Sequence, residues 1–144
     1  MDLDALRADL ERDEGVVAYG YQDSRGILTC GMGFNIDRQH GGGIPLEVIK
    51  FWAGVLLKRL ATQLEMTFGW WDRLDDVRQL VLANMAYNLG VGGLLEFKKM
   101  LAAVAADNYD AAADEMAEST WAKQVPNRAQ RLIVEMRTGV RSGD

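Results

Sequence analysis

Two carboxylic acids and a hydroxyl group lie close together near the start of the chain. Glu14 ends a helical pattern, Asp23 follows nine residues later in a turn, and Thr29 lies six residues further on, in a strand pattern. Carboxyl groups held by different backbone elements can face each other across a cleft, which is the minimum for acid-assisted attack of water on a glycosidic bond. On spacing alone, a solvated Glu at a helix end and an ordinary turn Asp also fit, and both are common.

The surroundings of the two acids favour different protonation states. A carboxyl group at the C-terminal end of a helix meets the negative end of the macrodipole, which favours the protonated form of Glu14. Burial beside Val16 and Val17 would act in the same direction. Asp23 lies in a polar turn and is expected to stay ionised. A protonated acid near an ionised carboxylate is the arrangement of a general acid and a base, and Thr29 could help to hold a water molecule.

The elements that carry these residues are a helix and two strands. Residues 2–14 repeat Leu3, Leu6 and Leu10 on one helical face. Residues 17–21 and 27–34 show strand patterns, and the turn between them has Asp at its first position and Gly at its fourth. The sequence therefore predicts a small antiparallel sheet after the first helix. The following loop, residues 35–45, contains three consecutive glycines and is expected to be flexible.

The rest of the chain shows helical patterns. They cover residues 46–65, about 76–90, 94–105, 109–118 and 126–137, the last opening with Pro126 in its first turn. The long 46–65 pattern is expected to turn one face toward a core, with Val48, Ile49, Trp52, Val55, Leu56, Leu60 and Leu64. The fold class is therefore α+β and mostly helical, in a single domain over residues 1–144.

Composition and charge narrow the classes of function. The chain has 144 residues, of which 49% are hydrophobic and 26% charged, as in a soluble globular protein. The sequence contains no run of eighteen apolar residues, so it predicts no membrane span. The net charge of −5 argues against nucleic acid as a partner. One cysteine, Cys30, and one histidine, His40, argue against a structural zinc site, and we expect no metal or cofactor.

The charge is uneven along the chain. Residues 1–14 carry two arginines against six acidic residues, a net −4. Residues 119–141 carry five basic residues against one acidic residue, a net +4. The two ends of the chain are therefore expected to attract one another.

Three ordered blocks of sequence resemble the phage lysozyme family, the endolysin muramidases of the T-even type. The first block is a helix ending in Glu-Gly, then a turn Asp, a Thr and a Gly-x-Gly. The second resembles the family's central helix and the third its last helix. The blocks cover nearly the whole chain: Glu14 to Gly33, Asn84–Gly90, and Trp121–Arg131 with Arg137–Gly139.

The resemblance implies a lysozyme-like fold and a reaction. A small sheet lobe of about residues 15–45 would be joined by the long helix to a helical lobe, residues 66–144, with a cleft between the lobes. The implied reaction is hydrolysis of the β-1,4 bond between N-acetylmuramic acid and N-acetylglucosamine in peptidoglycan, with inversion. Glu14 would be the general acid, Asp23 would assist the attacking water, Thr29 would position that water, and Arg128 would pair with Glu14.

Further residues could contact substrate. The family places a substrate-binding amide where Asn88 falls, although a core amide is the alternative. Tyr87, Gly33 and Phe34 could line the cleft, although aromatic residues at such spacings also occur simply in cores. Trp121 and the pair Trp70-Trp71 are expected to pack rather than to bind glycan. His40, in the glycine loop, is expected to be exposed and without a role.

One position departs from the family pattern. Phe34 stands where the T-even type has a histidine, whose acidic partner lies on the long helix. The corresponding region of this chain, around Val55 and Leu56, is apolar. Both halves of that ion pair are missing together, as replacement by hydrophobic packing requires.

These patterns predict a phage-type endolysin that acts on peptidoglycan as a monomer, without nucleic acid or stable membrane association. The alternatives are a lytic transglycosylase and a catalytically silent module that binds glycan. The N-terminal sequence lacks a conventional secretory signal. We therefore expect accumulation in the host cytoplasm and release to the cell wall through a pore made by another protein.

Overall fold

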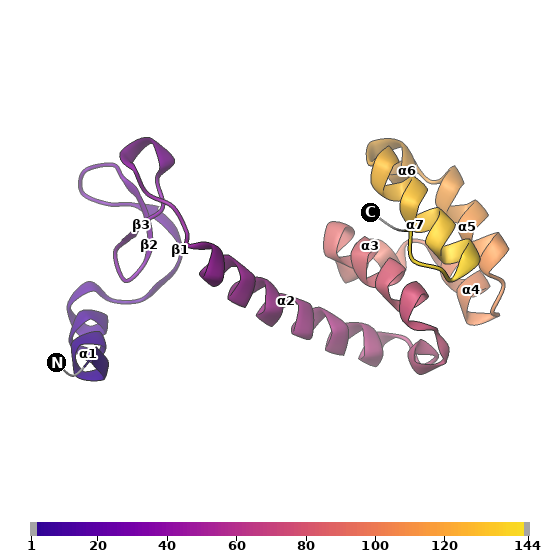
Figure 1. The fold of residues 1–144 in the computed structure, drawn as a ribbon, viewed down its shortest axis with the longest axis horizontal. Coiled ribbons are helices and arrows are strands. Elements are labelled where there is room, and N and C mark those ends of the chain that lie inside the picture. Colours follow the sequence, from indigo (N-terminus) through magenta and orange to yellow (C-terminus); the bar gives the residue numbers. More distant parts are fainter. Residues whose placement is uncertain (1–2, 143–144) are drawn as a thin grey trace. The chain divides into compact units, whose positions relative to one another are not determined.

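A computed structural model describes residues 3–142 of the chain (Figure 1). The chain divides into two compact units, Met1–Ala53 and Gly54–Asp144, and the boundary falls inside one long helix. The prediction of a mostly helical α+β chain with one small antiparallel sheet is confirmed. The elements in chain order are α1 (Leu3–Glu14), β1 (Val17–Gln22), β2 (Leu28–Gly31), β3 (Phe34–Asn35), α2 (Leu46–Thr67), α3 (Asp76–Leu95), α4 (Lys98–Ala105), α5 (Tyr109–Glu118), α6 (Thr120–Gln124) and α7 (Pro126–Thr138).

The sheet of the first unit runs in the order β1-β2-β3 with antiparallel neighbours. Between β1 and β2 the Gly26 N–H donates to the Asp23 carbonyl over 2.9 Å, which forms the predicted turn. Tyr21 on β1 lies opposite Thr29 on β2. The turn and the register thus place Asp23 and Thr29 on one hairpin.

Gly31 is required where β2 turns toward β3. Its φ of 63° lies in the left-handed region, and a Cβ there would lie 2.6 Å from a ring carbon of Phe34. The aromatic ring therefore packs directly on the Gly31 backbone. A side chain at position 31 would therefore clash with this ring.

Two polar side chains make hydrogen bonds within the loop after β3, and the flexibility that its glycines indicate stays a prediction. Asn35 accepts from the Asp37 N–H at 2.9 Å and donates to the His40 carbonyl at 3.1 Å. Asp37 accepts from the Gln39 N–H at 2.8 Å and contacts His40 Nδ1 at 2.9 Å. The His40 side chain is exposed, as predicted, and its contact is with Asp37 of the same loop. Asp37 has a lowered pKa, chiefly because of this contact with His40.

The buried hydrophobic core lies in the second unit. Every buried hydrophobic side chain among the described residues falls between Leu64 and Met136. Of the apolar α2 residues expected to face a core, Leu64 alone is fully buried. The expectation was wrong for Val48, Ile49 and Trp52, which are about half exposed. They precede Gly54 and so lie outside the unit that contains the core.

The central helix continues beyond its predicted end. Asp75 caps α3 by accepting from the Arg78 N–H at 3.0 Å. Gly90, predicted as the end of this helix, is instead a kink with φ 75° and ψ 159°, and helical structure resumes to Leu95. The short helix α6 was not predicted. It begins at a new cap, in which the Ser119 hydroxyl accepts from the Ala122 N–H at 3.1 Å.

Among the described residues, no single helix has both the length and the apolar composition needed to cross a membrane. One bent pair of helices, α3 with α4, meets those two criteria when taken together.

Candidate active site

Asp23 is held by the backbone of its own turn. Its Oδ1 accepts from the Arg25 N–H at 2.8 Å and from the Ile27 N–H at 2.9 Å. The bond from Ile27 is the largest cause of a lowered pKa at Asp23; burial opposes it, and the Arg25 N–H and guanidinium reinforce it. Hydrogen bonds to the charged form favour that form. The carboxylate is therefore fixed in position and kept ionised, as a base must be.

Thr29 is tied to Asp23 through the peptide group of Ile27. The Ile27 carbonyl accepts from the Asp23 N–H and from the Thr29 hydroxyl, each over 2.9 Å. Thr29 is buried, with 4% of its surface exposed. Because its hydroxyl proton is used on Ile27, its remaining lone pairs can only accept hydrogen bonds. Thr29 Oγ1 and Asp23 Oδ2 are thus two hydrogen-bond acceptors on one hairpin.

Glu14 lies at the end of α1, against the turn that follows β2. A Cβ built on Gly33 would lie 3.4 Å from Glu14 Oε2, so the carboxyl group faces the Gly33 backbone. The Glu14 side chain is exposed, and Val16 is 68% exposed. The expected burial of Glu14 beside Val16 and Val17 is therefore not observed. Glu14 is instead open to solvent within its unit and touches another residue of the predicted site.

In the second unit, Asn88 is oriented by a tryptophan. Trp121 Nε1 donates to Asn88 Oδ1 over 2.8 Å, and Trp121 is buried, as predicted. The Asn88 side chain itself is exposed. Because its oxygen accepts from Trp121, the amide presents its NH₂ group as a hydrogen-bond donor. Such a donor is suited to a carbonyl oxygen of a ligand.

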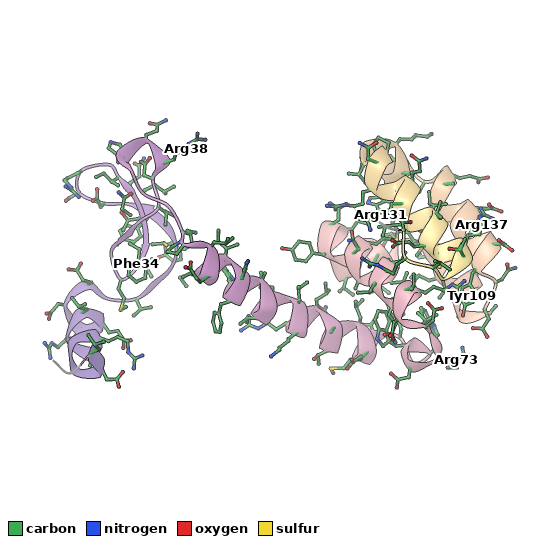
Figure 2. The ribbon with its side chains drawn as sticks, viewed as in Figure 1. Phe34, Arg38, Arg73, Tyr109, Arg131 and Arg137 are labelled. Atoms are coloured by element: carbon green, nitrogen blue, oxygen red, sulfur yellow. The ribbon has the colours of Figure 1, made fainter. Side chains whose placement is uncertain are left out.

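The other candidate residues are divided between the two units. Phe34 and Tyr87 are 55% and 60% exposed, and Figure 2 shows Phe34 on the sheet of the first unit. Arg128 is partly buried on α7. Arg128 belongs to the second unit and Glu14 to the first, and their pairing stays a prediction.

Sequence reasoning missed the roles of Ile27 and Arg25. Ile27 acts through its N–H and carbonyl, which every residue except proline carries, so the side chain gives no signal. Arg25 was part of a turn signal and not a candidate. An available clue was its position two residues after Asp23, where an Asp side chain commonly bonds the backbone N–H.

Comparison with known proteins finds relatives of this chain, three of which are described here. The first is "Probable T4-type lysozyme 1" of Dictyostelium discoideum, 38% identical over 69 residues, or 48% of this chain and 41% of that protein. "Probable T4-type lysozyme 2" of the same organism is 25% identical over 95% of this chain and 96% of its own length. The chain is thus similar to T4-type lysozymes. No family model matches the chain.

The third relative is much longer than this chain. The pre-baseplate central spike protein Gp5 of Enterobacteria phage T4 is 28% identical over 90% of this chain but only 27% of its own length. The matches thus span less than half of the first relative and about a quarter of the spike protein, but nearly all of the second Dictyostelium protein. The similarity to T4-type lysozymes agrees with the resemblance to the phage lysozyme family drawn from the sequence.

Proposed function

We propose that the protein is a muramidase that hydrolyses the β-1,4 bond between N-acetylmuramic acid and N-acetylglucosamine in peptidoglycan. The observation that carries this proposal is the Ile27 peptide group, to which both Asp23 and Thr29 are hydrogen-bonded. In the proposed site, Asp23 and Thr29 accept the two protons of one water molecule. The T4-type lysozymes among the relatives support the same reaction class. The role of an endolysin, released from the host cytoplasm through a separate pore, is part of the proposal.

In the proposed reaction, a water molecule donates one proton to Asp23 Oδ2 and a hydrogen bond to Thr29 Oγ1. Its oxygen then forms the bond to the anomeric carbon of N-acetylmuramic acid. The bond from that carbon to the glycosidic oxygen breaks, and Glu14 gives its proton to the departing oxygen. Attack by water on the face opposite the leaving group inverts the anomeric configuration. Both carboxyl groups then return to their starting states by exchange with solvent.

The binding residues are also part of the proposal. The Asn88 NH₂ group would donate to the carbonyl of a sugar N-acetyl group, with its orientation fixed by Trp121. Tyr87, Gly33 and Phe34 would contact the glycan, and Arg128 would pair with Glu14. The cleft between a sheet lobe and a helical lobe stays a prediction from the family resemblance.

The deciding experiment replaces the proposed acid. Glu14→Gln keeps the shape of the side chain and removes its acidity, so we expect a loss of about 10²–10⁴-fold in turbidity decrease of permeabilised Gram-negative cells. Glu11→Gln is the matched control, because Glu11 is an exposed residue of the same helix. Circular dichroism checks that both variants fold. Full activity of Glu14→Gln would overturn the proposal.

Product analysis tests the chemistry itself. Mass spectrometry should find muropeptides with a hydrated reducing end, and an anhydro sugar would instead indicate a transglycosylase. Proton NMR at early times should find the α-anomer from the β-linked substrate, as inversion requires. Measurable glycan binding without any product would indicate a silent binding module.

A further inference from the structure

The two oxygens of Asp23 have different surroundings. Both lone pairs of Oδ1 that lie in the carboxylate plane are used by the N–H groups of Arg25 and Ile27. A proton taken from water must therefore go to Oδ2. In the described part of the chain, the cation within ion-pair distance of Oδ2 is the Arg25 guanidinium, with Nε at 3.6 Å. The oxygen needed for catalysis is thus the one that Arg25 faces.

The Arg25 contact is close enough to act on Asp23 and weak enough to be released. At 3.6 Å it is an ion pair without a short hydrogen bond, and 77% of the Arg25 side chain is exposed. Exposed pairs of this kind contribute little to folding stability. Their charge still favours the ionised form of the carboxylate. The guanidinium can therefore hold Oδ2 in the free protein and give way to a water molecule when substrate binds.

The backbone and side chain of Arg25 contact Asp23 independently. The N–H group bonds Oδ1, and the guanidinium faces Oδ2. Replacing the side chain leaves the N–H bond and the turn in place. A change in behaviour after such a replacement therefore reports on the guanidinium alone.

We propose that Arg25 is a positioning residue for the hydrolysis: its guanidinium pairs with Asp23 Oδ2 in the free protein and favours the ionised carboxylate that accepts the proton of water. This inference rests on the proposed function, in which Asp23 assists the attacking water. The lowered pKa of Asp23, to which Arg25 contributes after Ile27, acts in the same direction. Arg25 extends the working range of the base toward acid pH.

The test measures activity against pH in R25Q, R25K and R38Q. R25Q should move the acid limb of the profile to higher pH, with roughly a twofold to fivefold loss of activity on the acid side and little change near neutrality. R25K keeps the charge and should restore most of that activity. R38Q removes a cation from another exposed position of the same unit, labelled in Figure 2, and should leave the profile unchanged. An R25Q profile that coincides with the native one would overturn the inference.

A second measurement separates this inference from the proposed function. NMR of ¹³C-labelled aspartate carboxyl groups follows the titration of Asp23 without any turnover. We expect the Asp23 midpoint to rise in R25Q and the difference to shrink in 1 M salt, where the screening length is about 3 Å. An unchanged midpoint would overturn the Arg25 role even if the protein cleaves peptidoglycan. Full activity of D23N would instead overturn the proposed function.

Discussion

At the scale of single residues, the orientation of the Thr29 hydroxyl is the most specific feature of the candidate site. Its proton is donated to the Ile27 carbonyl, so the oxygen can accept from water but cannot donate to it. A lone water between Thr29 and Asp23 would then have its free lone pair available for attack.

This orientation predicts opposite outcomes for two replacements of Thr29. Thr29→Val keeps the shape but removes the hydroxyl, so we expect activity to fall about tenfold or more, the cost of one lost hydrogen bond in the reacting complex. Thr29→Ser keeps the hydroxyl and should retain most activity. Cell-wall turbidity assays measure both, with thermal unfolding as the check on folding. Equal activity of the Val and Ser variants would show that the hydroxyl has no role.

The carboxylate of Asp23 predicts a dependence of stability on pH. Its pKa is lowered in the folded chain, so its stabilising effect is full above the unfolded value of about 3.9 and is lost as pH falls through the folded pKa. Asp23→Asn cannot lose this effect. Denaturant unfolding between about pH 5 and pH 2 should therefore show the native protein losing stability faster than Asp23→Asn. Parallel curves would contradict the prediction. Asp37 also has a lowered pKa, but both proteins carry it, so its contribution to the pH dependence of stability is the same in each.

Sequence reasoning could identify Glu14, Asp23 and Thr29 because their side-chain types and spacing match a known pattern. It could not identify Ile27, because peptide groups have no signature in the sequence. It also treated Asn88 as either a ligand amide or a core amide. The structure lies between these two alternatives. The Asn88 oxygen accepts a hydrogen bond from the buried Trp121, but the Asn88 side chain is exposed to solvent.

At the scale of elements, α7 carries a buried carboxylate that folding has not fully satisfied. Glu135 is fully buried; its Oε1 accepts from the Ser142 N–H at 3.1 Å and lies 3.6 Å from Arg131 Nη1. Among the described residues its Oε2 has no hydrogen-bond partner. Figure 2 labels Arg131, whose side chain is 40% exposed. The last helix thus depends on one partly exposed arginine to offset a buried charge.

This dependence can be measured with a double-mutant cycle. Arg131→Met leaves Glu135 buried without its cation and should lower the free energy of unfolding by about 1–3 kcal/mol, less than for a fully buried pair. Adding Glu135→Leu to that variant should recover most of the loss, since the buried charge is then gone. Urea unfolding gives the four stabilities. If the two losses simply add, the pair is not coupled.

The starts of α3 and α7 were predicted more closely than the end of α3. Asp75 and Pro126 begin α3 and α7, because a capping side chain and a proline in the first turn act locally. The sequence predicted an end at Gly90, but a glycine also permits a single residue of non-helical backbone after which a helix resumes. Whether the helix resumes depends on packing, and Val91 and Leu94 are buried beyond the kink.

At the scale of the whole molecule, the two units differ in how much apolar surface they bury. Every buried hydrophobic side chain of the described residues lies between Leu64 and Met136. Among the residues of the first unit whose burial is described, the buried one is Thr29. Periodicity predicted the helices of the second unit well because a 3.6-residue pattern reflects a packed face. Periodicity overestimated the burial of side chains on the first half of α2. The pattern shows that a helix has an apolar face, but not whether that part of the helix belongs to the unit that contains the core.

The uneven burial predicts uneven protection against hydrogen exchange. Amide groups of α3, α5 and α7 should exchange most slowly, and those of β1 and β2 faster, since local opening of the sheet exposes little apolar surface. Exchange measured by NMR or mass spectrometry at neutral pH tests this. Strand amides as slow as those of α7 would contradict it.

The Ile27 peptide group also bears on how such sites evolve and can be designed. The link between Asp23 and Thr29 consists of backbone atoms, so residue 27 can change to almost anything except proline without breaking it. Natural variation at this position should therefore be wide while the neighbouring acid and hydroxyl stay constant. The segment from Asp23 to Thr29 carries its own hydrogen bonds, and we expect it to keep its geometry when grafted onto a hairpin of another scaffold.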